Sequence, residues 1–299
     1  MIAAALLATA TAVGVGGVSA QASGPLEHTT TYSHVIEVVM ENFSYGQAVG
    51  TSGYQALAHR WASASDSYAA SHPSLPNYLD MTSGSTFGIN SDCTSCYVSS
   101  NNVGAQMTAK HLTWGDFSEG VPRKCYLGST DGLYAGKHNP FRYYDDIRAS
   151  YALCDHLQSL AVFTRDLRRP GAVPRYSFVS PNLCHDGHDC SPSEAFGWLS
   201  GFVRSVTSST AWSHNGLLIV TWDEGSDSDT SQVLASGKVL SNGGGGHIPT
   251  LFVAPRVPQG TVVTQPVTHE MLLATIEANF GLAPLNGAAA WSSNTLSLP

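Results

Sequence analysis

The chain has 299 residues, of which 42% are hydrophobic and 12% are charged. This is enough apolar material for one large core, and it excludes a chain that is disordered throughout. The 14 Lys and Arg residues against 22 Asp and Glu residues give a formal net charge of -8 at pH 7. Because a protein that binds nucleic acid through phosphate contacts needs a basic surface, we expect no nucleic-acid partner.

Residues 1–22 have the features of an export signal. They contain no charged side chain, and Ala20 and Ala22 place small residues at the spacing that a signal peptidase requires. Scattered glycine, threonine and serine residues make the stretch only weakly apolar, which argues against a membrane-spanning anchor. We therefore expect residues 1–22 to be cleaved, residues 23–299 to be secreted as one domain, and no stable membrane span to remain.

Four short runs that are nearly continuous in apolar or β-branched residues predict buried strands. These runs are residues 34–40, 175–180, 216–222 and 248–254. Segments with a helical pattern alternate with them, and Gly281 ends the last one. These segments are residues 54–62, 156–169, 193–206 and 269–280. The alternation indicates an α/β fold with a doubly wound, mostly parallel sheet flanked by helices, which binds ligands beyond the carboxyl ends of its strands.

Two of the predicted strands are followed directly by oxygen-bearing side chains. Glu41 and Asn42 come after the first run, and Asp223 and Glu224 come after the run that ends at residue 222. Adjacent carboxylates repel one another unless a cation compensates their charge. The set suits a divalent metal such as Mg, Ca or Mn, with Zn also in question. Alternatively, each residue is an exposed turn residue, since Asn and Asp are common in turns.

Residues 71–84 predict a helix that begins near Ser74 or Leu75, because Pro76 fits in a first helical turn. Ser74 would then lie at the helix N-terminus, where the dipole favours an alkoxide and binds a phosphate. Alternatively, Ser74 is an ordinary N-cap. The chain contains no G-x-S-x-G nucleophile elbow, which argues against a conventional serine esterase or lipase.

The loop after the run at 175–180 carries two histidines and an aspartate between Cys184 and Cys190: His185, His188 and Asp189. Read alone, the histidines and cysteines have the side chains of a zinc site. Export favours a disulfide instead, which would close a loop beside the carboxylates at the same sheet edge. Proximity likewise suggests the pairs Cys93–Cys96 and Cys125–Cys154, although the sequence alone does not fix the pairing.

Two further histidines are candidates for the site, because histidine is the side chain best placed to donate a proton near neutral pH. His247 follows the glycine-rich residues 241–246, which predict a flexible loop, and His269 begins the last predicted helix. Each of them alone is equally well explained as a structural histidine.

Seven motifs occur in order over nearly the whole chain: MENFSYG, SHPSLPNYL, KHNPFRYYDDI, FVSPNLCHDGHDCS, LLIVTWDEG, GGHIPTLFVAP and THEMLLATIE. They resemble the phosphoesterase family that contains bacterial secreted acid phosphatases and non-specific phospholipases C. The resemblance implies that residues 23–299 form one catalytic domain with an alkaline-phosphatase-like α/β core and a metal-assisted hydroxyl nucleophile.

Matched motif by motif, the resemblance implies a role for individual residues. Ser74 is the expected nucleophile, and one divalent ion is expected on Glu41, Asn42, Asp223 and Glu224. The residues expected to line the phosphate site are His185, His188 and Asp189, with His188 preferred as the group that protonates the leaving oxygen. Further contacts to the substrate are expected from Asn77, His138 and His247.

The implied activity is that of a secreted, metal-assisted acid phosphatase that hydrolyses phosphomonoesters through a phosphoseryl intermediate. The expected substrate is a phosphate ester, with phospholipids and phosphoinositides among the candidates. One alternative is a phospholipase C that cleaves phosphodiesters, but the stretch DEGSDSDTSQ lacks the histidine of that branch, and the chain has no room for its carboxy-terminal domain. Another alternative is a secreted binding protein without catalysis.

Overall fold

The computed structural model describes residues 1, 31–234, 236–240 and 243–298, so the expected export signal lies, apart from Met1, outside the described residues. An eight-stranded sheet forms its centre, in the order β13-β2-β12-β9-β1-β8-β4-β7. Strand β1 (His34–Met40) pairs in parallel with β8 (Tyr176–Ser180) on one side and with β9 (Gly216–Trp222) on the other. The three strands are therefore aligned with their carboxyl ends at one edge.

The remaining strands are short. They are β2 (Ala62–Ala64), β3 (Ser67–Tyr68), β4 (Trp114–Ser118), β5 (Thr130–Asp131), β6 (Tyr134–Ala135), β7 (Leu157–Ser159), β10 (Gln232–Val233), β11 (Val239–Leu240), β12 (Thr250–Val253), β13 (Val262–Val263) and β14 (Val267–Thr268). The α-helices are α1 (Tyr45–Ala48), α2 (Ser52–Arg60), α3 (Ser74–Ser83), α4 (Val103–Ala109), α5 (Asp145–Ala149), α6 (Tyr151–Cys154), α7 (Leu160–Asp166), α8 (Pro192–Thr207), α9 (Thr210–Ser213) and α10 (His269–Phe280). The 3-10 helices are η1 (Gly136–His138), η2 (Pro140–Tyr143) and η3 (Asn286–Trp291).

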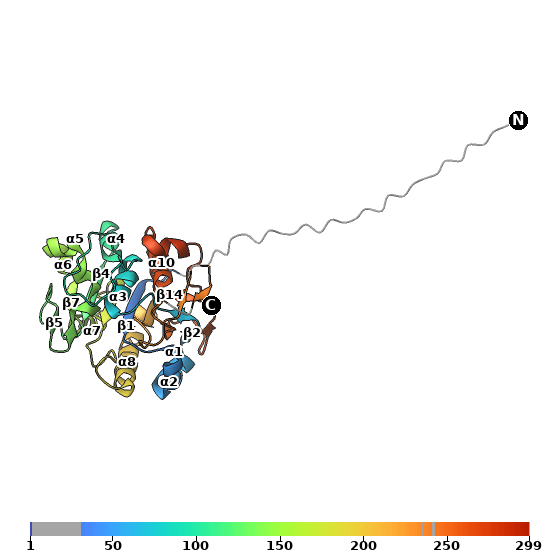
Figure 1. Ribbon diagram of the computed structural model, residues 1–299, viewed down its shortest axis with the longest axis horizontal. Coiled ribbons are helices and arrows are strands. Elements are labelled where there is room, and N and C mark those ends of the chain that lie inside the picture. Colours follow the sequence, from blue (N-terminus) through green and yellow to red (C-terminus); the bar gives the residue numbers. More distant parts are fainter. Residues whose placement is uncertain (2–30, 235, 241–242, 299) are drawn as a thin grey trace.

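Both faces of the sheet are covered by helices, as Figure 1 shows with α3 and α10 on one side and α2 and α8 on the other. Successive side chains of a strand point to opposite faces. Accordingly, Val35 and Val39 belong to the core under α3 and α10, whereas Ile36, Val38 and Met40 belong to the core under α2 and α8. This arrangement explains why the central strands are continuous apolar runs.

The four predicted strands are confirmed, with differences of at most two residues at their ends. Strand β12 is the exception to the parallel direction, because it is antiparallel to both β9 and β2. Its first residue, Thr250, pairs with Thr221 near the end of β9. The start of β12 therefore lies at the same edge as the carboxyl ends of β1, β8 and β9, and the prediction of a doubly wound, mostly parallel sheet is confirmed.

The predicted helices are confirmed with one correction. The segment 156–169 was predicted as one helix, but its first residues form β7, whose Leu157 pairs with Asp116 of β4. The helix α7 begins only at Leu160, where Ser159 caps its N-terminus. Pairing with β4 at the edge of the sheet overrides the local helical pattern here. Helix α10 covers the predicted residues and ends at Gly281, whose φ of 64° is left-handed.

Three disulfides join the cysteines in the expected pairs, Cys93–Cys96, Cys125–Cys154 and Cys184–Cys190. Within the described part of the chain, no helix combines the length and the apolar character needed to cross a membrane.

Candidate active site

Acidic residues from two neighbouring strands meet at the carboxyl edge of the sheet. Glu41 follows β1 directly, Asp223 and Glu224 follow β9, and all three are buried. The backbone N–H groups of Asn42 and Glu224 both donate to Asp223 Oδ1, at 3.2 Å and 2.7 Å. The structure thus brings together the four residues that the sequence predicted as a metal-binding set.

Ser74 is the first residue of α3, and its hydroxyl lies among these carboxylates. Ser74 Oγ lies 3.1 Å from Glu41 Oε2 and 3.3 Å from Glu224 Oε1, and it can donate its proton to either. The N-cap position is occupied by Pro73, so capping does not explain Ser74. Because the positive end of the ten-residue helix points at this oxygen, negative charge on it is stabilised.

Lys137, a residue that the sequence analysis did not select, contacts the same serine. Its Nζ lies 3.3 Å from Ser74 Oγ and 2.9 Å from Asp92 Oδ2. Burial alone would lower the pKa of Lys137, but the hydrogen bond to Asp92 and the nearby carboxylates leave the pKa raised. Asp92 Oδ1 also accepts the backbone N–H of Leu75 in the first turn of α3. Lys137 is therefore a positive charge that Asp92 holds against the serine.

His72 supports the site from the opposite side. Its Nδ1 lies 2.6 Å from Glu224 Oε2, and its Nε2 lies 2.8 Å from the carbonyl oxygen of Asp229. The hydrogen bond to Glu224 raises the pKa of His72 to about 9, against a smaller opposing effect of burial. Both carboxylate oxygens of Glu224 are thus engaged, one by Ser74 and one by a charged imidazole. Glu224 is thus a partner of both the serine and the imidazole, and its role as a metal ligand stays a prediction.

His138 lies beneath the acidic residues, 1% exposed, and not on the surface of a substrate pocket. Its Nε2 is 3.1 Å from Glu41 Oε1 and its Nδ1 is 3.3 Å from Asp186 Oδ2. The ring stacks on Tyr78, with the centroids 5.0 Å apart, and Tyr78 donates its hydroxyl to Glu41 Oε1. The structure therefore corrects the predicted contact with substrate: His138 is a buried neighbour of the carboxylates.

The buried cluster carries more negative charge than its own side chains can neutralise. Burial raises the pKa of Glu41 well above its ordinary value, and the charges of Asp223 and Asp186 raise it further. Burial, followed by the charge of Glu224, does the same to the pKa of Asp223. Burial lowers the pKa of His138 well below its ordinary value, so this ring contributes no positive charge. A cation would relieve this repulsion.

The donor atoms of the cluster fit a divalent metal ion. Within this cluster, four buried side-chain atoms make no hydrogen bond to the described part of the chain: Asn42 Oδ1, Asp223 Oδ2, Asp186 Oδ2 and His138 Nε2. Ligand atoms of Glu41, His138 and Asp186 also lie within 4.8 Å of one another. Oxygen atoms with one imidazole nitrogen are suitable for Mg, Mn, Ca or Zn. His138 and Asp186 are thus candidate ligands in addition to Glu41, Asn42 and Asp223.

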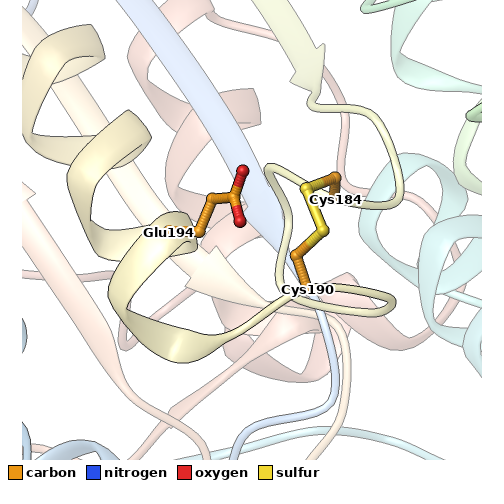
Figure 2. Close-up of side chains that lie close together, drawn as sticks. All are labelled: Cys184, Cys190 and Glu194. Carbon is orange, nitrogen blue, oxygen red and sulfur yellow. A yellow bond between two sulfur atoms is a disulfide. The ribbon is translucent and has the colours of Figure 1, made fainter.

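The loop between β8 and α8 is closed by the Cys184–Cys190 disulfide, which Figure 2 shows with the Glu194 side chain directed toward it. Because both sulfur atoms are bonded to each other, they are not thiolate ligands, and the zinc interpretation of this loop is wrong. His188 and Asp189 pair with each other, with His188 Nδ1 2.7 Å from Asp189 Oδ1.

The two histidines of this loop face different neighbours. His188 Nε2 lies 3.5 Å from Lys137 Nζ, which itself contacts the serine. His185 Nδ1 lies 2.8 Å from Glu119 Oε2, and the His185 ring stacks on Trp198. His188 is therefore oriented toward the Ser74 cluster, and His185 is oriented toward Trp198 of α8.

Asn77 and His247 were predicted to contact the substrate, but in the structure both side chains contact other groups of the protein. Asn77 is 0% exposed and its amide is fully used: Oδ1 accepts from the N–H groups of Ala70 and Ser71, and Nδ2 donates to the carbonyls of Ser71 and Pro73. It fixes the turn before the serine. His247 stacks between Tyr45 and Tyr68, with centroids 4.5 Å and 4.9 Å away, and its Nε2 bonds to the carbonyl of Ser65. The Asn77 amide therefore has no free polar atom for a phosphate, and Nε2 of His247 is already bonded.

The glycine-rich segment before His247 was predicted as a flexible loop, and its described residues 243–246 make contacts with the turn before Ser74. Gly245 donates its N–H to Ala69, and a Cβ at Gly245 would lie 2.3 Å from the carbonyl oxygen of Ser71. Only glycine allows the backbone to approach this turn so closely.

The sequence analysis missed four residues of the site: His72, Asp92, Lys137 and Asp186. Three of them lie inside quoted motifs, His72 in SHPSL, Lys137 in KHNPF and Asp186 in CHDGHD. Their position within the motifs was an available signal. Asp92 lies in no motif, and only the fold reveals its contact with α3.

Comparison with known proteins identifies the family of this chain. Residues 20–283 match the model of the "Phosphoesterase family". The chain is 31% identical to a "Phosphatidylinositol-3-phosphatase" of Mycobacterium tuberculosis over 87% of this chain and 80% of that protein. It is 26% identical to a "Phosphate-repressible acid phosphatase" of Penicillium chrysogenum, over 85% of this chain and 60% of that protein. The chain thus spans less than two thirds of the fungal relative.

Solved structures show the same fold at low sequence identity. One is a protein of the alkaline phosphatase superfamily from Vibrio parahaemolyticus, with a TM-score of 0.59, 12% identity, and coverage of 90% of this chain and 72% of that chain. Another is the murine ectonucleotide pyrophosphatase/phosphodiesterase 5, with a TM-score of 0.53, 12% identity, and coverage of 85% and 96%. The expected alkaline-phosphatase-like core is confirmed.

Proposed function

Since this chain belongs to the phosphoesterase family, whose similar members are named as hydrolases of phosphoric esters, we propose that it is a secreted acid phosphatase that hydrolyses phosphomonoesters with Ser74 as nucleophile. The observation that carries the proposal is the contact of one buried hydroxyl with two carboxylates and one lysine. Ser74 Oγ lies within 3.3 Å of Glu41, Glu224 and Lys137.

In the proposed first step, Ser74 attacks the phosphorus in line with the leaving oxygen. The bond from Ser74 Oγ to phosphorus forms, and the bond from phosphorus to the leaving oxygen breaks. The carboxylates of Glu41 and Glu224 are positioned to accept the proton of the hydroxyl. Lys137 and the N-terminus of α3 stabilise the negative charge that develops on the serine oxygen. Water then hydrolyses the phosphoserine and releases phosphate.

The leaving oxygen needs a proton, and His188 is the proposed donor. Asp189 holds the Nδ1 side of this ring, which leaves Nε2 toward the serine cluster. Lys137 Nζ lies closer to Asp92 and Ser74 than to His188. The ester oxygen of a bound substrate can therefore take the place of Lys137 next to His188 Nε2. A pH profile of activity that is flat across the neutral range would contradict a histidine acid.

The proposed metal site consists of Glu41, Asn42 and Asp223, with Asp186 and His138 at its inner side. A divalent cation bound there would offset the carboxylate charge and stabilise the negative charge on the phosphoryl oxygens. Exhaustive dialysis against a chelator should abolish activity, and adding back Mg, Mn, Ca or Zn one at a time should identify the ion. Binding of the ion, measured by calorimetry, should be weakened in Asp223→Asn; full activity after chelation would remove the metal from the proposal.

The nucleophile is tested by replacing Ser74 with alanine. The matched control is Ser83→Ala, which removes a buried hydroxyl at the other end of α3, where Ser83 donates to the carbonyl of Leu79. We expect Ser74→Ala to lose hydrolysis of an aryl phosphate and to lose the phosphoserine that acid quenching traps in the parent protein. Near-normal hydrolysis by Ser74→Ala would refute the mechanism.

The substrate class is proposed from the comparisons: phosphomonoesters in general, with a phosphoinositide monoester as one candidate because a relative is named for that activity. A panel should compare an aryl phosphate, phosphatidylinositol 3-phosphate and phosphatidylcholine. Phosphate release from the first two supports the proposal. Release of diacylglycerol from phosphatidylcholine would favour phospholipase C instead, and no turnover of any substrate would favour a binding protein.

A further inference from the structure

A groove of about 910 Å3 lies between α7 and α8, on the side of the sheet away from α3. Both helices run away from the carboxyl edge of the sheet, since each follows a strand that ends there. Glu119, directly after β4, lines the groove at this edge, and Arg168 and Ser205 line it farther along the helices. The groove therefore begins at the carboxyl edge of the sheet, near the loop between β8 and α8, and extends away from this edge.

Trp198 and Phe202 line one side of the groove, and the His185 ring stacks on Trp198 outside the lining. The His185 ring lies 5.8 Å from Trp198, and Trp198 lies 5.1 Å from Phe202, in nearly parallel planes. Glu119 holds His185 by its Nδ1 atom. The mechanism proposed above uses His188 and leaves these rings without a role.

Arginines supply an excess of positive charge along the groove. The residues are Arg165, Arg168 and Arg169, with Arg204 in the adjoining hollow. Asp166 pairs with two of them, at 3.0 Å from Arg165 and 3.9 Å from Arg169. Arg168 and Arg204 are exposed, and their guanidinium groups have no partner among the described residues. Four of the 14 cationic residues of a chain with net charge -8 thus gather at one groove.

Two glycines keep the groove open. Gly197 and Gly201 lie inside α8, where glycine is unfavourable compared with alanine. A Cβ at Gly197 would meet no atom within 4 Å, and a Cβ at Gly201 would meet only the Arg204 guanidinium at 3.7 Å. Close packing therefore does not require glycine at either position. The absent side chains leave space in front of Trp198 and the arginines.

We propose that this groove binds the head group of an anionic phospholipid and docks the protein on a negatively charged bilayer. Free guanidinium groups bind phosphate in bidentate fashion, and the half-buried Trp198 offers an apolar face beside them, as tryptophan does at membrane interfaces. The rest of this acidic chain is repelled by an anionic bilayer, so the arginine groove is the face that can approach it.

The test is co-sedimentation with vesicles of phosphatidylcholine alone and of phosphatidylcholine with about 20 mol% phosphatidylserine. Phosphatidylserine has no terminal phosphate, so a phosphomonoesterase activity does not consume it. We expect the full chain to bind only the anionic vesicles and to dissociate as salt is added. Arg168→Gln and Arg204→Gln should each weaken binding about fivefold and together about 25-fold. Gly197→Leu, which fills the groove, should also weaken binding.

Arg256→Gln is the matched control, because Arg256 is exposed and follows β12 on the other half of the sheet. It should bind anionic vesicles like the parent. Hydrolysis of a soluble aryl phosphate should be unchanged in every one of these variants, which excludes misfolding. Binding that the groove variants leave unchanged, or that Arg256→Gln weakens as much, would overturn the proposal. Because vesicle binding needs no turnover, failure of the proposed phosphatase activity would leave this result interpretable.

Discussion

A buried carboxyl group in the central strand gives a sharp prediction about stability and pH. Glu37 in β1 is 0% exposed. Its Oε2 accepts the hydroxyl of Tyr176 at 2.8 Å, and its Oε1 has no partner in the described part of the chain. Burial raises the pKa of Glu37 from 4.5 to about 7, although the bond from Tyr176 opposes the rise. Glu37 should therefore be neutral in the folded protein at mildly acidic pH.

The sign and size of the effect follow from linkage. Below about pH 4.5, Glu37 is protonated in both the folded and the unfolded chain, and its full contribution to stability is present. As the pH rises through about 7, the unfolded chain has already released its proton, so the contribution is lost. One unit of pKa difference corresponds to about 1.4 kcal/mol, so the loss is about 3 kcal/mol at alkaline pH.

The perturbation is Glu37→Gln, which keeps the shape and removes the ionisation. Any cost of the unpaired amide N–H is the same at every pH. We therefore expect the unfolding free energy of the variant, relative to the parent, to increase by about 3 kcal/mol between about pH 4.5 and pH 8. Urea denaturation at four pH values measures this difference, in which the contributions of all other titrating groups cancel.

The matched control is Glu194→Gln, which removes an exposed carboxylate in the first turn of α8. A difference between Glu37→Gln and the parent that stays constant across the pH range would refute the reasoning. It would mean that water or a local rearrangement solvates the Glu37 carboxylate in the folded protein.

Three further predictions concern the site. Lys137→Met should lower kcat/KM for an aryl phosphate by about 100-fold, because it removes a charged donor from the nucleophile; Lys137→Arg should recover part of the rate in the same assay, and full activity of Lys137→Met would contradict this role. His72→Gln should lower the unfolding free energy more at pH 6 than at pH 10, since the raised pKa of His72, about 9, stabilises the fold at acidic pH and this contribution is lost as the pH passes 9; equal losses at both pH values in urea would contradict the charged pair with Glu224. Gly245→Ala should reduce both the melting temperature and phosphatase activity, because its Cβ would collide with the Ser71 carbonyl; an unchanged melting temperature would show that the turn before Ser74 can move.

Much of the fold could be predicted from the sequence, because the central strands are buried on both faces and their apolar runs are unambiguous. The residues after those strands were then placed correctly, since parallel strands deliver their carboxyl ends to one edge. This is why Asn42 and Asp223 were predicted as neighbours although they lie 181 positions apart in the chain. Ser74 was predicted from Pro76 and the motif around it.

The supporting contacts could not be predicted, because they come from loops without periodicity. Lys137 precedes a residue that was selected, but only the placement of η1 beside the start of α3 brings its Nζ to Ser74. Asn77, which was predicted to contact the substrate, binds backbone groups instead for a related reason. A polar side chain in a motif is equally compatible with binding a ligand and with binding backbone groups, and its burial decides between the two.

The cap of α3 has a consequence for how the molecule can be inactivated. The helix that presents Ser74 has a proline at its N-cap, and the carboxylate that accepts the N–H of Leu75 in its first turn, Asp92, comes from a loop 17 positions farther along the chain. Gly88, Asn90 and Ser91 in that loop are exposed. A single proteolytic cut there would free Asp92 and leave Lys137 without the carboxylate that holds it against the serine. We expect such a nicked protein to lose turnover before its sheet unfolds, so its abundance would be a poor measure of its activity.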